Sequence, residues 1–198
     1  IHSNPYDYWI YPYSASHIPF TYPHISWVIL RPFLEPLSGH QSIQDFANDI
    51  LSESNNHTME FLSILNQRLN QEIRYEYREE GPPYFPEKTL LEKHGSCRDL
   101  AVLFMAVTRS VGIASRYVSG YYYNVDRLDD HELHAWAEVF IPGGGWRGFD
   151  PSSGVATTGY HVDICSCSDP LHCYPVQGTY QGNAESQLSA SVTIEIES

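Results

Sequence analysis

The stretch that decides the fold reads GSCRDLAVLFMAVTRSVG over residues 95–112, HELHAWAEV over 131–139 and GWRGFDP over 145–151. In this order it contains one cysteine, Cys97, one well-placed histidine, His134, and one aspartate, Asp150. Three such residues can act as a nucleophile, a base and a group that orients the base, provided that they meet in space. The pattern between them predicts the His134–Asp150 contact, but it does not establish that Cys97 meets His134.

The first segment predicts a helix that begins near Cys97. Ser96 suits the N-cap position, and Gly112 suits a left-handed residue just beyond the last turn. Between them the apolar residues recur at helical spacing, at Leu100, Leu103, Phe104, Val107 and Val111. Cys97 then lies in the first turn, where free backbone N–H groups and the helix dipole should help its thiol to ionise. The alternative is that Cys97 is a small buried apolar residue, the commoner fate of a cysteine.

The two later segments predict an antiparallel hairpin. Residues 133–141 and 145–149 read as strands, joined by a turn rich in Pro and Gly over 142–145. Folding about this turn places the residue opposite His134 within a position or two of Asp150, and opposed Cβ atoms are roughly 4.5–5.5 Å apart. Local pattern alone therefore predicts a His–Asp pair.

Trp136 shares the face of His134, because side chains alternate along a strand. It is a candidate to exclude water from the imidazole and to line a substrate cleft. His131 forms H-x-x-H with His134, but three residues along a strand place the two rings on opposite faces, so we expect His131 to be a solvated loop residue. With a further strand expected over residues 113–123, the predicted fold class is α+β, a cysteine-bearing helix packed on an antiparallel sheet.

These segments resemble the transglutaminase-like superfamily of papain-like cysteine enzymes, whose bacterial branch includes cysteine proteases. The matching words are GSCRDLAVLFMAVTRSVGIASRYVSGY (95–121), HAWAEVFIPGGGWRGFDPSSG (134–154) and PVQGTYQG (175–182). The resemblance implies that Cys97 is the nucleophile, His134 the general base and Asp150 the orienting acid. It also implies that the loop before the cysteine helix lines the cleft.

We expect a cysteine-dependent acyl-transfer enzyme that cleaves an amide, in a peptide or an isopeptide, through a thioester. Hydrolysis ranks first because water is the default acceptor and the sequence marks no second amine site. The alternatives are an amine-accepting transglutaminase that cross-links or deamidates proteins and, in another class, a non-catalytic module that binds peptides. We expect no cofactor and no metal, since the sequence has no stretch with the oxygen-ligand spacing of a calcium loop.

Composition and net charge limit the classes of partner that this protein can bind. The 198 residues have a formal net charge of −13 with 18% charged residues, which argues against nucleic acid and anionic membranes as partners. The length suits one domain that buries about 70% of its unfolded surface. We expect a cytoplasmic protein, because no basic-then-apolar leader is visible. The first residue is Ile1 and not Met, so we also expect a piece of a longer chain, which in relatives often carries a β-rich N-terminal domain.

The N-terminal segment, residues 1–36, is rich in Tyr and Pro, and the catalytic domain is expected over 37–198. Prolines forbid a continuous helix and central strands, so we expect an extended segment that wraps the core with its rings buried. An aromatic ligand platform is the bolder alternative.

Two helices follow, one with apolar residues from Ile43 to Leu51 and Ser42 as its N-cap, and one after Thr58. Alternation over residues 74–78 then predicts a short strand with both tyrosines inward. Tyr84 and Phe85 lie in the loop before the cysteine helix and are candidate substrate contacts, although simple packing explains them equally well. The tail over 188–196 alternates and predicts a further strand.

Three more cysteines follow a strand-like patch over residues 160–164. Cys165, Cys167 and Cys173, with His161 and His172, invite a zinc interpretation. Their spacing does not fit a paired C-x-x-C site, and we expect the thiols of the C-x-C pair to point to opposite faces of a strand. Space-filling is the favoured interpretation, ahead of zinc or a disulfide. His161 is similar to a family position at the start of this strand.

Overall fold

The computed structural model describes residues 4–78, 81–123, 133–174, 181–183 and 192–194. Its centre is a five-stranded sheet in which each strand is antiparallel to its neighbours. The strands follow the order β6 (Val155–Ala156), β5 (Gly145–Asp150), β4 (Leu133–Ile141), β3 (Ser115–Tyr122) and β7 (His161–Cys167). The expected α+β architecture is confirmed.

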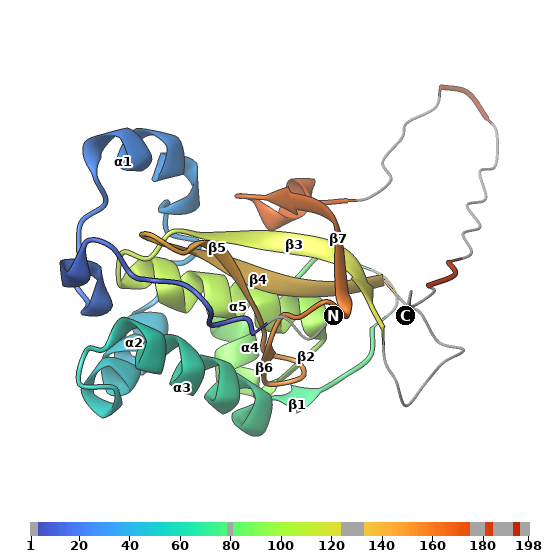
Figure 1. The fold of residues 1–198 in the computed structure, drawn as a ribbon. Coiled ribbons are helices and arrows are strands. Elements are labelled where there is room, and N and C mark those ends of the chain that lie inside the picture. Colours follow the sequence, from blue (N-terminus) through green and yellow to red (C-terminus); the bar gives the residue numbers. More distant parts are fainter. Residues whose placement is uncertain (1–3, 79–80, 124–132, 175–180, 184–191, 195–198) are drawn as a thin grey trace.

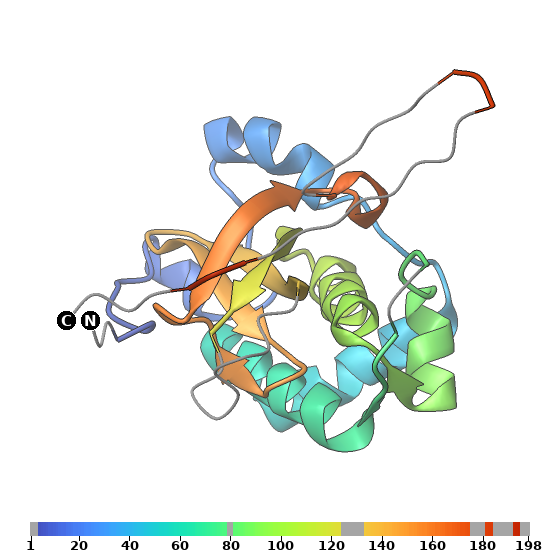
Figure 2. The same cartoon turned by 90° about the vertical axis from the view of Figure 1, so that its right-hand side faces the viewer.

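Helix α5 (Cys97–Ser110) packs against one face of this sheet. In both views it lies between the sheet and a layer of helices (Figure 1, Figure 2), which are α2 (Gln41–Glu53), α3 (Thr58–Glu72) and α4 (Pro86–Glu92). Phe104 of α5 stacks on Phe149 of β5, with ring centroids 5.5 Å apart. The burial of such apolar side chains from both layers fixes the position of α5 on the sheet.

The ends of α5 are where the sequence places them. Ser96 is the N-cap, and Gly112 has a φ of +83°, the left-handed conformation that glycine adopts without strain. The carboxylate of Asp99 accepts hydrogen bonds from the backbone N–H and the hydroxyl of Ser96. Cys97 is therefore the first helical residue.

The hairpin is formed by β4 and β5 around a turn at residues 142–144, with Ala137 opposite Phe149. Gly143 and Gly145 both have positive φ values, which explains why the turn is glycine-rich. Alternation along β4 turns Ala135, Ala137, Val139 and Ile141 into the core. The other face of β4 carries His134 and Trp136.

The sheet is strongly curved. Strands β5 and β7 are separated by two strands in the sheet order, yet His161 of β7 reaches Asp150 of β5. A β-bulge in the β3–β7 ladder lies between Ser119 and Gly120, and bulges bend strands in this way. Figure 2 shows the curved course of β7 along the edge of the sheet.

The N-terminal segment differs from the expectation of an extended chain with buried rings. It contains η1 (Tyr13–Ser16), α1 (His24–Leu30) and η2 (Arg31–Phe33), and α1 stands clear of the sheet (Figure 1). Tyr22 is buried, but Trp9, Tyr11 and Tyr13 are exposed. The prolines do exclude a long helix, but they leave room for a helix of seven residues between Pro23 and Pro32.

Two further expectations are wrong in detail. The N-cap of α2 is His40, whose side chain accepts from the backbone N–H of Ser42, so Ser42 is not the cap. Residues Arg74–Tyr75 form β1, which pairs in parallel with β2 (His94–Gly95) in a separate two-stranded sheet. Tyr75 and Tyr77 are exposed instead of inward, because this short ribbon lies outside the main sheet.

The chain after β7 forms η3 (Pro170–His172). Residue His131, most of the PVQGTYQG motif and most of the predicted tail strand lie outside the described residues. Within the described part of the chain, no helix is both long and apolar enough to span a membrane.

Candidate active site

Cys97 occupies the N-terminus of α5 and is 8% exposed. As the first residue of the helix, it has a backbone N–H for which the helix supplies no acceptor. The dipole of a 14-residue helix also favours a negative charge at this end. A thiolate and an oxyanion beside it are the two charges that this position suits.

His134 and Asp150 meet as the hairpin predicts. The Nε2 atom of His134 lies 2.9 Å from Oδ2 of Asp150, and Asp150 is completely buried. Asp150 occupies the last position of β5, and His134 the second position of β4. With Nε2 directed at the carboxylate, Nδ1 is the ring nitrogen that remains for another partner.

Cys97 is a second hydrogen-bond partner of the His134 side chain. Burial lowers the pKa of His134, but hydrogen bonds to Asp150 and Cys97, with the negative charges of both, outweigh burial and raise the pKa to about 10. His134 thus lies between the sulfur and the carboxylate. The structure brings together the three residues that the sequence singles out.

The carboxylate of Asp150 is held on both of its oxygens. The backbone N–H and the hydroxyl of Ser152 donate to Oδ1, at 3.0 and 2.7 Å, while His134 and His161 approach Oδ2. Burial would raise the pKa of Asp150, but the hydrogen bonds from His134, His161 and Ser152 hold it well below its usual range. These hydrogen bonds favour the ionised form of Asp150.

The region from residue 44 to residue 151 matches the family model of the transglutaminase-like superfamily. This match covers more than half of the chain and includes the cysteine, the histidine and the aspartate. The chain belongs to the transglutaminase-like superfamily.

Relatives of known sequence are similar over about half of the chain. A protein of Mycobacterium leprae is 33% identical over 105 residues, which are 50% of this chain and 37% of the relative. A protein of Mycobacterium tuberculosis is 30% identical over 111 residues, 51% of this chain and 35% of the relative. The matched part of the chain thus spans about a third of the length of these proteins.

Solved structures share the transglutaminase-like fold. The Cytophaga hutchinsonii protein described as a "putative cysteine protease" has a TM-score of 0.58 and 24% identity, over 71% of this chain and 47% of that one. Legionella pneumophila LapG has a TM-score of 0.51 and 14% identity, over 67% and 85% of the two chains. At these identities the likeness concerns the fold.

Within this transglutaminase-like fold, sequence reasoning missed two partners of Asp150. Ser152 lies two residues after the aspartate, in the DPSSG motif, and short-range hydrogen bonds from Ser to Asp were a readable signal. His161 offered no such signal, since its contact with Asp150 depends on the curvature of the sheet. Sequence singled out His161 only for a zinc interpretation and as a family position.

Trp136 is 1% exposed, with its ring centroid 5.2 Å from that of His161 and 6.2 Å from that of His134. A side chain with so little exposed surface does not line an open cleft, so the candidate role as a substrate contact is not supported. Its position beside the imidazoles fits the exclusion of water.

Tyr84 is half-buried between two cations, with the guanidinium carbon of Arg78 4.1 Å and Nζ of Lys88 3.7 Å from its ring centroid. Its backbone N–H donates to Asp99, which also pairs with Arg78 at 2.7 Å. These contacts fix the approach loop to the cysteine helix, as the packing interpretation of Tyr84 expects. Phe85 is 74% exposed and remains available to a ligand.

Among the residues that the structure describes, the Asp150 cluster is the group of side chains with the spacing of a metal site. Ligand atoms of His134, Asp150 and His161 lie within 4.8 Å of one another. However, the backbone N–H of Thr158 donates to Nδ1 of His161 at 3.3 Å, which leaves the ring proton on Nε2, the nitrogen that faces Asp150. A metal ligand needs a lone pair at that nitrogen, so the group fits hydrogen bonding to Asp150 better than a metal.

The two histidines that the zinc interpretation combines with the C-terminal cysteines have other partners. His161 turns to Asp150, and His172, which is exposed, lies 3.6 Å from Asp169. Cys165 and Cys167 share a face of β7, because residues two apart on a strand point the same way, so the expectation of opposite faces is wrong.

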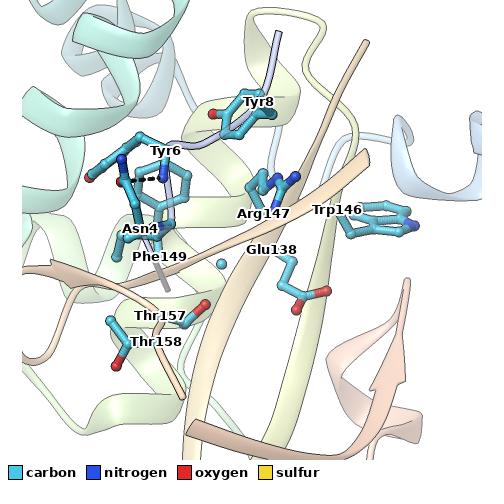
Figure 3. A pocket seen from close by; sticks show the side chains of 12 residues that line it. Asn4, Tyr6, Tyr8, Glu138, Trp146, Arg147, Phe149, Thr157 and Thr158 are labelled. Carbon is cyan, nitrogen blue, oxygen red and sulfur yellow. Dashed lines mark hydrogen bonds between the residues drawn. The ribbon is translucent and has the colours of Figure 1, made fainter. Parts of the chain in front are cut away.

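A pocket of about 190 Å³ lies between the N-terminal segment and strands β5 and β6 (Figure 3), and Cys97, His134 and Asp150 are not among its lining residues. Tyr6 and Tyr8 line one side, and Glu138, Arg147 and Thr158 are among the residues that line the others. The aromatic N-terminal segment thus contributes to a concave surface.

Proposed function

We propose that this protein is a cysteine-dependent acyl-transfer enzyme that uses Cys97, His134 and Asp150 as its catalytic triad. The observation that carries the proposal is the position of His134, whose Nε2 contacts Asp150 and whose side chain also has Cys97 as a hydrogen-bond partner. A buried carboxylate that holds one ring nitrogen directs the other toward the nucleophile.

In the first step, the Cys97 sulfur attacks the carbonyl carbon of an amide, and a C–S bond forms. The oxygen becomes an oxyanion, for which the backbone N–H of Cys97 is a suitable donor. The C–N bond then breaks, and the imidazolium of His134 gives its proton to the leaving amine. The product is a thioester on Cys97 and a neutral imidazole.

In the second step, His134 takes a proton from water while the oxygen attacks the thioester carbonyl. The C–S bond breaks, the acid leaves, and the thiolate of Cys97 is restored beside the imidazolium of His134. Asp150 stays ionised throughout, because its partners hold its pKa well below the usual range. The same thioester could pass to a primary amine, as in a transglutaminase.

The proposed substrate is an amide in a peptide or an isopeptide. The Cytophaga protein whose name refers to a cysteine protease shares the fold, which supports peptide bonds as a first choice. Phe85 is the exposed residue of the approach loop that suits an apolar substrate contact.

Formation of the thioester is the direct test. Incubation with an activated ester such as p-nitrophenyl acetate should yield an acylated protein, with the added mass on the peptide that contains Cys97. Cys97→Ser should lose this adduct, and Cys167→Ser is the matched control that should keep it. An adduct that forms equally well in Cys97→Ser would favour the non-catalytic peptide-binding module.

The acceptor is tested with a glutamine-containing peptide, with and without an added primary amine. Hydrolysis or deamidation that is little changed by the amine supports the hydrolase. Amine incorporation that outruns deamidation would make the transglutaminase the better assignment.

A further inference from the structure

His161 shares a carboxylate oxygen with the proposed catalytic histidine. Its Nε2 lies 3.3 Å from Oδ2 of Asp150, and the Nε2 of His134 lies 2.9 Å from the same oxygen. The second oxygen of Asp150 is occupied by Ser152. Each oxygen of this buried carboxylate therefore has two donors.

The protonation of His161 follows from its other nitrogen. The backbone N–H of Thr158 donates to Nδ1 at 3.3 Å, so Nδ1 carries no proton. A proton on Nδ1 would face the N–H of Thr158 directly. His161 is thus a neutral ring with its proton on Nε2, and it donates this proton to Asp150.

The ring of His161 is fixed and removed from any substrate. Its side chain is 2% exposed. It packs against Tyr122, with ring centroids 4.6 Å apart, and edge-on against Trp136 at 5.2 Å. Such a residue does not reach a substrate, and its hydrogen bond to the proposed triad goes to Asp150.

We propose that His161 is a positioning residue for the His134–Asp150 pair, a neutral donor that divides the charge of Oδ2 between two imidazoles. The carboxylate then holds His134 in place without binding its proton as tightly as an undivided carboxylate would. The effect of His161 on catalysis rests on the proposed function, but its hydrogen bond to the carboxylate oxygen that His134 also contacts does not.

The physical reason is that the pKa of a general acid should suit the proton transfer that it performs. Proton transfer is most efficient when the pKa of the acid lies near the working pH. The pKa of His134 is already raised to about 10 by Asp150 and Cys97. A carboxylate without the second donor would raise it further, and His134 would give its proton less readily to the leaving amine.

Two variants of nearly equal size separate this role from packing. In His161→Gln, the side-chain amide can place an N–H near the position of Nε2, whereas His161→Met offers no donor. Both variants remove the Nδ1 acceptor of Thr158, so they differ mainly in the hydrogen bond to Asp150. Thermal unfolding shows whether each variant folds, and His161→Leu replaces the Met variant if that one does not.

The first measurement is an NMR titration of His134 with histidine labelled at Cε1, assigned by the signal that His134→Gln loses. In His161→Met we expect the pKa of His134 to rise by roughly half a unit to one unit, as the loss of one charged hydrogen bond implies. In His161→Gln the titration should stay close to that of the wild type. Equal titrations in both variants would overturn the proposal.

The second measurement is the rate of thioester formation with p-nitrophenyl acetate. We expect His161→Met to be slower by about 10-fold and His161→Gln to recover most of the rate. Equal losses in both variants would leave only a packing role. If the wild type forms no thioester, the proposed function fails, while the titration of His134 still decides the role of His161.

A second observation, independent of the first, concerns the C-terminal cysteines. The Sγ atoms of Cys165 and Cys173 lie 3.4 Å apart, and the Cys173 thiol is buried. Both Cys165 and Cys167 approach Cys173, and burial with these neighbouring thiols raises the pKa of Cys173. In the structure all four cysteines are free.

We propose that Cys165 and Cys173 form a disulfide under oxidising conditions and so tie the edge strand β7 to the turn after it. With glutathione disulfide as the oxidant, a thiolate of the pair attacks it and releases one glutathione. The second thiol then displaces the other glutathione, loses its proton and closes the bond. Two thiols are oxidised and one disulfide is reduced, so the electrons balance.

The test is a peptide map, without reduction, of the folded protein after incubation with glutathione disulfide. A peptide that links Cys165 with Cys173 is expected in the wild type and in Cys167→Ser, and its loss is expected in Cys165→Ser. The oxidised protein should also unfold at a higher temperature, by on the order of 5 °C. Mixed disulfides with glutathione only, or a link through Cys167, would overturn the assignment.

Discussion

Asp150 and His134 are joined by a hydrogen bond of 2.9 Å between Oδ2 and Nε2, across two neighbouring strands of one hairpin. The bond fixes which ring nitrogen is left for Cys97. A short turn and the alternation of two strands are sufficient to produce the His134–Asp150 pair, and the docking of α5 on the sheet brings Cys97 to it.

Asp150→Asn should destabilise the protein, because it breaks the buried pair with His134, and should remove most of the activity of the molecules that stay folded. The amide would present an N–H or a carbonyl to His134 and would no longer stabilise the imidazolium. By analogy with the aspartate of serine-protease triads, we expect thioester formation to fall by about 10³- to 10⁴-fold. Asp163→Asn, at an exposed position of β7, is the control and should keep the wild-type rate.

The stability contributed by His134 should depend on pH. The pKa of His134 is raised in the folded protein, from 6.5 to about 10, so the native state binds the proton more tightly than the unfolded state. The stabilisation is full below about pH 6.5 and is lost as the pH rises through about 10.

Urea unfolding of the wild type and of His134→Gln at several pH values measures this dependence. The difference in free energy of unfolding should shrink by a few kcal/mol between pH 6.5 and pH 10. A difference that stays constant over this range would mean that His134 gains no proton affinity on folding.

Asp99→Asn should destabilise the protein strongly. Asp99 is completely buried, pairs with Arg78 and accepts from Ser96 and the backbone of Tyr84. Breaking a buried ion pair costs about 3–5 kcal/mol.

The matched control is Asp49→Asn, at an exposed position of α2, which should change stability by less than about 0.5 kcal/mol. Urea unfolding measures both. A loss in Asp99→Asn no larger than that in the control would show that the approach loop is not held through this carboxylate.

Gly120→Ala should disturb the site through packing. A Cβ at residue 120 would lie 2.0 Å from the carbonyl oxygen of Val162 and 2.8 Å from Trp136, so β7 or the indole must move. Since Trp136 packs on both histidines, we expect a loss of about 1–3 kcal/mol in stability together with slower thioester formation. Gly39→Ala, which has open space around its Cβ, should match the wild type in both measurements.

The sequence predicts those parts of the site that depend on interactions between residues close together in the chain. The start of α5 at Cys97 follows from Ser96 and the helical spacing, and the His134–Asp150 pair follows from a turn of fixed length. The Cys97–His134 contact needed a resemblance to a known family, because it depends on how the helix docks on the sheet.

The rest could not be predicted because it depends on long-range geometry. His161 reaches Asp150 only through the curvature of the sheet, and no local pattern encodes that curvature. The exposure of Tyr75 and Tyr77 follows from the parallel pairing of β1 with β2, which joins segments about 20 residues apart. The many prolines of the first 36 residues correctly excluded a long helix there, but they did not predict the short helix α1.

The most direct test of the account is the rate at which each cysteine is alkylated by iodoacetamide near pH 6, read from peptide masses. We predict that Cys97 reacts at least about 10-fold faster than Cys165, Cys167 and Cys173, because His134 stabilises its thiolate, and that His134→Ala removes this advantage. Equal rates for all four cysteines in the folded wild type would contradict the proposed catalytic role of Cys97 and favour a peptide-binding module.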